Sequence, residues 1–142
     1  MSENINALDE INKGACMGMD ALTFVMDKVN NNKLHAELER EYNEYEKISQ
    51  RIENIYHKYD DGKPHETNIM NKAMTWSGVE MKTFNDTTSS KIAELLLNGV
   101  NMGIIEGCKI LNNKKMNKEV RDIVQEYVDM QEKNVENLKC YL

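Results

Sequence analysis

The sequence is poor in the residues that build β-rich, disordered or disulfide-stabilised proteins. Its 142 residues include one proline and seven glycines, too few for the many tight turns of an all-β fold or for a Pro/Gly-rich disordered chain. The three cysteines, Cys16, Cys108 and Cys140, are widely spaced and form no CxxC pair. We therefore interpret them as reduced thiols in a cytoplasmic protein, without a disulfide framework.

The net charge is negative, and we expect neither a leader sequence nor a membrane span. The formal net charge is −6 without a basic stripe, and such a surface repels phosphate backbones, so we expect no nucleic-acid partner. The first four residues contain neither a basic nor an apolar region, so we expect no signal peptide. The longest apolar stretch, 92–110, is too interrupted to predict a membrane span. Its polar interruptions are Glu94, Asn98, Asn101, Glu106 and Lys109.

Motifs for enzymatic chemistry are scarce as well. The chain contains no Gly-x-Ser-x-Gly elbow and no Cys–His pair that spacing would join. Its glycines do not follow a predicted strand, as a phosphate-binding loop requires. The sequence therefore favours a protein without catalytic residues, although these patterns leave enzymatic activity open.

The chain does contain a persistent helical pattern. Apolar residues recur three and four positions apart along most of its length, as on the buried stripe of an amphipathic helix. Helix-breaking or capping residues separate these segments at 30–32, 60–64 and 86–90, and Asn117 is a predicted cap. The predicted helices are 3–29, 33–60, 66–84, 89–111 and 118–141.

The connections predict how these helices are arranged. The breaks after the first and fourth predicted helices are short, so each forms an antiparallel αα-hairpin with the next long helix. The fold class is therefore all-α, a single domain over residues 1–142 and a four-helix bundle. The two hairpins are joined by a long crossover that contains the short helix 66–84.

Some apolar residues suggest a partner surface. Segment 89–111 is apolar on nearly every face, which indicates a central helix or a homo-oligomer, most simply a dimer. The short crossover helix is rich in methionine, which packs adaptably either in a core or at a pocket or partner surface. The candidate residues are Met70, Met74, Trp76 and Met81. The identity of a protein or small-molecule partner is not indicated.

Glycines inside helices form the least expected pattern. Each costs about 1 kcal/mol relative to alanine in a helix interior, so their number calls for a packing reason. They are Gly14, Gly18, Gly99, Gly103 and Gly107. Spacing of four places each set on one helix face, and we predict tight packing between helices 3–29 and 89–111 there. The alternative is a glycine-lined slot for a ligand.

The two hairpins resemble each other and, together, a known superfamily. Residues 14–18 match 99–103 in glycine spacing, and Glu41–Glu44 match Glu126–Asp129 in acidic spacing. The chain resembles the ferritin-like superfamily, most closely bacterial members that lack its metal motifs. Members that bind two metals carry one Glu on the first and third helices and Glu-x-x-His on the second and fourth. Here neither acidic motif contains a histidine.

The resemblance defines where a metal would bind, if one binds. We expect no cofactor and no metal ion; the carboxylates available in the corresponding places are Glu41, Glu106, Asp20 and Glu44. Glu41 lies on the predicted inward stripe, where an acid must pair, bind a cation or hold a proton. We favour the simpler interpretation that these acids reach solvent at the edges of the apolar stripes.

The leading hypothesis is therefore a non-enzymatic ferritin-like bundle that acts by binding or self-association. The alternative is a carboxylate-ligated metal-binding or iron-handling protein of the same fold, such as a di-metal oxidoreductase.

Overall fold

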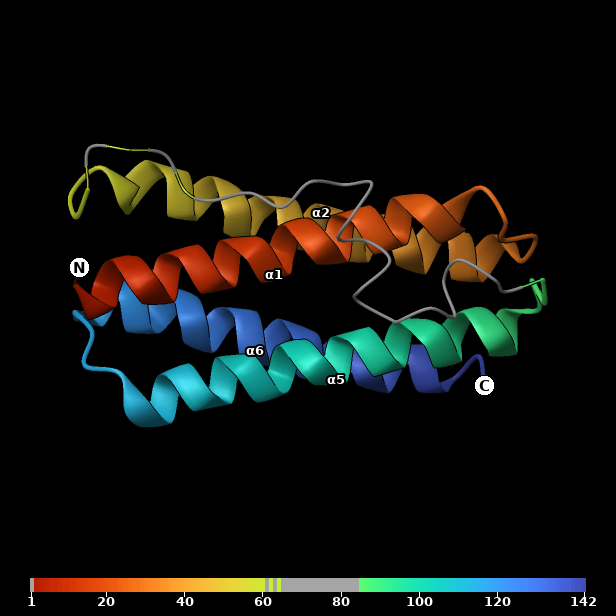
Figure 1. Cartoon of the computed structure of the whole chain (residues 1–142). Helices are drawn as coiled ribbons and strands as arrows, with labels where there is room; N and C mark the ends of the chain where they lie inside the picture. The colour runs from red at the N-terminus through yellow and green to blue at the C-terminus, as the bar shows by residue number, and fades with distance from the viewer. Residues whose placement is uncertain (1, 61, 63, 65–84) are drawn as a thin grey trace.

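The structure, a computed structural model, describes residues 2–60, 62, 64 and 85–142. Across these residues it contains helices and no strand, which confirms the all-α class and the long predicted helices (Figure 1). The helices are α1 (Glu3–Met26), α2 (Asn32–Tyr56), α5 (Ser89–Asn113) and α6 (Lys118–Lys139). The predicted helix 66–84, with Met70, Met74, Trp76 and Met81, lies outside the described residues.

The helices begin where the sequence predicts them to begin. Side-chain oxygens of Ser2, Asn31 and Thr88 accept hydrogen bonds from backbone N–H groups in the first turns of α1, α2 and α5. Asn117 precedes α6, but its side chain donates to the Tyr59 hydroxyl (3.2 Å) and does not cap the helix.

The ends of α1 and α2 come a few residues earlier than predicted. After Met26 and after Tyr56 the backbone continues in turns, with hydrogen bonds between residues three apart. Such bonds commonly tighten a helix end before the chain changes direction. None of the four described helices has the length and apolarity that crossing a membrane requires.

The helices pack as two pairs. α1 lies along α2 and α5 along α6, each pair running antiparallel across a short connection (Figure 1). Between the pairs, α1 lies beside α5 and α2 beside α6, and α1 also contacts α6 across the diagonal. α2 ends at the opposite end of the bundle from the start of α5, so these two helices run in the same direction (Figure 1).

Apolar stripes from all four helices meet in one core. Buried examples are Leu8, Leu38, Leu96 and Val124, one from each helix. The apolar surplus of segment 89–111 is absorbed mostly by this core, where Ile92 and its neighbours are buried. Two of its residues remain well exposed on α5: Met102 at 49% and Ile105 at 53%.

The helix-interior glycines accommodate large side chains from α2 and α6. A Cβ atom at Gly18 would lie 2.8 Å from the Cζ atom of the Tyr45 ring. Added at three of the other glycines, it would collide with α6 side chains. These contacts are Gly14 with Tyr127, Gly103 with Gln131 and Gly107 with Val128. The sequence had predicted that the glycines of α1 and α5 would pack these two helices against each other; instead the nearest neighbours of Gly14, Gly18, Gly103 and Gly107 are side chains of α2 and α6.

This packing makes Gly18→Ala a test of the α1–α2 contact. Alanine favours the helix by about 1 kcal/mol, but overpacking against the buried Tyr45 ring costs about 1–3 kcal/mol, so we expect a net loss of stability in urea denaturation. In a Tyr45→Leu background the same change should stabilise the protein, because the ring is gone. Stabilisation by Gly18→Ala in the parent would contradict the contact.

Candidate functional site

An acidic side chain lies inside the bundle. Glu41, on α2, is 1% exposed, so the interpretation that the candidate acids reach solvent is wrong for this residue. Burial, followed by a hydrogen bond and charge repulsion from Glu37, raises the pKa of Glu41 to about 10. Glu41 is therefore a neutral carboxylic acid at neutral pH.

Polar side chains around Glu41 join α2 to α6. Arg40 holds Glu37 through two hydrogen bonds, Nε to Oε1 (3.1 Å) and Nη2 to Oε2 (2.7 Å), and donates a third to Asn134 Oδ1 (2.9 Å). One turn further along α2, the Tyr45 hydroxyl accepts a hydrogen bond from Gln131 Nε2 (3.2 Å). The interface between the two hairpins thus contains a polar layer within an apolar core.

The same interface continues toward the other end of α2. Arg51 pairs with Glu126, and Glu119 accepts hydrogen bonds from Lys58 Nζ (3.1 Å) and from the Tyr59 hydroxyl (2.5 Å). These ion pairs are half-exposed and each adds little stability, but together they align α2 with α6.

The structure changes which residues of the two hairpins are equivalent to each other. Glu126, matched to Glu41 by sequence, has an exposed side chain, while its neighbour Tyr127 is buried. Counted from Asn31 and Asn117, the residues that precede α2 and α6, Tyr127 is equivalent to Glu41. The sequence match was therefore displaced by one residue, which on a helix moves a side chain to a different face.

The four acids that could have ligated a metal do not come together. Glu106 is exposed and pairs with Lys109 (3.9 Å), and Glu44 pairs with Arg40 (3.7 Å). Asp20 is half-buried on α1, where burial raises the pKa of its carboxyl to about 6. Within the described part of the chain, no group of three or more His, Cys, Asp or Glu side chains is placed to hold a metal ion.

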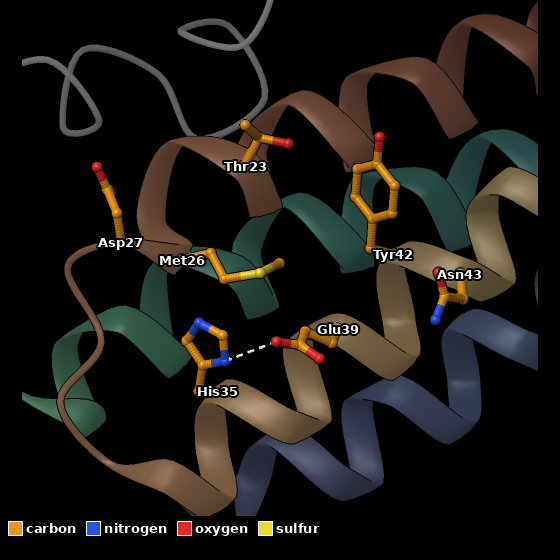
Figure 2. A pocket seen from close by; sticks show the side chains of 7 residues that line it. All are labelled: Thr23, Met26, Asp27, His35, Glu39, Tyr42 and Asn43. Carbon is orange, nitrogen blue, oxygen red and sulfur yellow. Dashed lines mark ion pairs between the residues drawn. The ribbon is translucent and has the colours of Figure 1, made fainter.

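A pocket of about 590 Å³ lies where α1 turns into α2 (Figure 2). Its lining residues are Thr23, Met26, Asp27, His35, Glu39, Tyr42 and Asn43. Figure 2 shows the His35 ring turned toward Glu39, with Nδ1 3.0 Å from Oε1. No sequence pattern predicted this pocket, because it depends on how the hairpin folds back. The carboxylates of Glu39 and Asp27 already have partners, His35 and Lys28.

A groove separates α1 from α5 on another side of the bundle. Its polar part has a volume of about 720 Å³ and is lined mainly by charged and amide side chains from Glu3 to Lys13 and from Glu106 to Lys114. Toward the middle of the bundle the groove narrows into a more apolar cavity of about 160 Å³. Gly14 and Gly103, two of the five helix-interior glycines, both line this cavity.

Comparison of the chain with known protein families, with curated proteins and with solved structures finds no match. The roles of these surfaces are therefore argued from their geometry.

The buried carboxyl predicts a pH dependence of stability. Unfolding releases the proton that native Glu41 holds, so the stability contributed below the unfolded pKa is lost as pH rises toward about 10. Between about pH 7 and pH 9, the free energy of unfolding should fall by up to about 1.4 kcal/mol per pH unit. Glu41→Gln should remove this slope in urea denaturation, whereas Glu44→Gln, on the same helix but half-exposed, should keep it. Parallel curves for the parent and Glu41→Gln would show that Glu41 is ionised in the native state.

Proposed function

We propose that this protein is a non-enzymatic, ferritin-like four-helix bundle that acts by self-association through the exposed face of α5. The observation that carries the proposal is the exposure of Met102 and Ile105, two large apolar side chains on one helix. Large apolar side chains that lie together on a surface are a common mark of a protein interface.

The exposed residues of α5 form a continuous stripe. Glu94, Asn98, Met102, Ile105 and Lys109 follow one another at spacings of three and four, and all are exposed. The stripe therefore has an acid toward its beginning, two apolar side chains in its central part and a base toward its end.

This order of charges selects an antiparallel second copy. When Glu94 of one copy lies opposite Lys109 of the other, the twofold axis passes between Asn101 and Met102, and the same pair recurs on the other side. Met102 and Ile105 of both copies then lie near the centre of the contact. A parallel copy in register would instead place Glu94 against Glu94 and Lys109 against Lys109.

Apolar burial and charge make different contributions to such a pair. Complete burial of a Met or Ile side chain contributes about 1.5–3 kcal/mol, less here because both are already half-covered. Exposed ion pairs contribute about 0–1 kcal/mol each. The apolar side chains would therefore supply most of the affinity, and the charges would select the orientation.

The ferritin-like arrangement is supported by the two antiparallel helix pairs and by the common direction of α2 and α5 (Figure 1). The alternative, a di-metal oxidoreductase or iron-handling protein, lacks a supporting site among the described residues. There Glu41 is buried, whereas Glu106 is exposed and pairs with Lys109.

Sedimentation equilibrium over a range of protein concentrations tests the self-association. We expect the parent to shift from monomer to dimer as concentration rises, and Ile105→Glu to shift the equilibrium to monomer by at least tenfold in dissociation constant, since it places a charge in an apolar contact. Leu142→Glu is the matched control, because Leu142 is also an exposed apolar residue (60%) but lies at the C-terminus. A single 16.5 kDa species at every concentration of the parent would refute the proposal.

A charge exchange tests the orientation separately. Glu94→Lys alone and Lys109→Glu alone should each weaken the dimer several-fold, because each places like charges opposite one another in the antiparallel pair. The double variant should recover most of the parent affinity, since both ion pairs return with reversed polarity. Additive weakening in the double variant would exclude the antiparallel register.

A further inference from the structure

The cavity between α1 and α5 is small, and its walls are mostly apolar. Its volume is about 160 Å³. The side chains of Ile11 and Met17 on α1 and of Met102 on α5 form the walls, and Gly14 and Gly103 contribute bare backbone. The charged lining residues, Glu10, Lys13 and Glu106, belong also to the polar groove that continues from the cavity.

The third helix at this cavity, α6, contributes buried polar groups. Tyr127 lines the cavity although it is 1% exposed, and its hydroxyl occupies the space that a side chain at Gly14 would need. Its ring also meets the Tyr45 ring edge-on, with centroids 6.4 Å apart, which holds the hydroxyl in place.

One turn further along α6, an amide has an unsatisfied oxygen. Gln131 is fully buried, its Nε2 donates to Tyr45, and its Oε1 lacks a hydrogen-bond partner among the described residues. This oxygen lies 2.7 Å from the position that a Cβ at Gly103 would take, but Gln131 itself does not line the cavity. Tyr127 is therefore the α6 residue whose polar group a ligand in the cavity can reach.

We propose that this cavity binds a small neutral molecule with one aromatic ring and one hydroxyl group, of the phenol class. The volume is close to that of an engineered cavity of about 150 Å³ that binds benzene, so one aromatic ring fits. The thioethers of Met17 and Met102 are favourable neighbours for an aromatic ring. The hydroxyl belongs at the α6 side of the cavity, toward the Tyr127 hydroxyl.

The α6 side of the cavity favours a neutral ligand group. Tyr127 carries no formal charge, and burial raises the pKa of Tyr127 well above its usual value, with Tyr45 as a second cause. Burying an ionised group directly against this hydroxyl, which offers no opposite charge, would be unfavourable. A ligand hydroxyl, in contrast, can form a hydrogen bond with the Tyr127 hydroxyl. This site goes beyond the proposed self-association. Met102 belongs both to the cavity and to the exposed stripe of α5, whereas Met17, Gly14 and Tyr127 lie outside that stripe.

Methionine-methyl NMR of the full chain provides the test, with phenol and toluene as probes of equal size. In the parent we expect both probes to shift the Met17 and Met102 methyl signals at millimolar concentration, while Met116 and Met130, which do not line the cavity, stay unchanged. Phenol should bind about tenfold more tightly than toluene, as one hydrogen bond to a buried partner allows.

Variants then assign the hydrogen bond and the cavity. Tyr127→Phe should reduce the preference for phenol at least threefold, whereas Tyr59→Phe, which removes a hydroxyl bonded to Glu119, should leave it unchanged. Met17→Phe places a ring in the cavity and should abolish binding of both probes without altering α6. The proposal is overturned if neither probe shifts Met17, if all methionines shift equally, or if Tyr127→Phe retains the full preference.

Discussion

The position of Tyr45 in the core is the constraint on which the rest of the bundle depends. Its ring fills the space left by Gly18 on α1, its hydroxyl accepts a hydrogen bond from Gln131 on α6, and its edge meets the Tyr127 ring. One side chain of α2 therefore contacts both its own hairpin partner and the other hairpin. A shift of either hairpin by one turn would leave Gln131 without this partner and would place another α1 side chain against the ring. Tyr45 thus couples the packing within the first hairpin to the alignment of the second.

The glycines make this arrangement possible and also shape the surface. Each costs about 1 kcal/mol of helix stability, which large buried side chains offset by packing into the space. Because Tyr127 fits against Gly14, α6 approaches α1 across the diagonal of the bundle. The α1–α5 side meanwhile retains a polar groove and a small cavity. The same glycines that allow close packing on one side therefore leave an accessible cavity on another.

The polar layer next to Tyr45 contributes selectivity more than stability. Glu41 is kept neutral by its surroundings, and Arg40 satisfies Glu37 and Asn134 together. Replacing such groups by apolar residues would often be neutral or stabilising, but an apolar interface has many nearly equivalent registers. Here Arg40 loses its contact with Asn134 if α2 slides along α6. The layer therefore favours one alignment of the hairpins, and with it one exposed stripe on α5, where Met102 and Ile105 lie outside the core.

Local sequence determined most of the secondary structure of this protein. The periodicity of apolar residues predicted the four long helices, and the capping residues Ser2, Asn31 and Thr88 mark three of their starts, because both signals act over one or two turns. The heptad position of Glu41 correctly placed it on the inward stripe, although not whether it would be buried or reach solvent. The partners of the glycines, the burial of Glu41 and the one-residue displacement between the hairpins were decided only in the folded molecule. These features depend on how far each helix is rotated about its axis and on how one hairpin rests on the other. Both are set by side chains that are distant in sequence, such as Tyr45 and Gln131, whose contact cannot be read from the residues around either one.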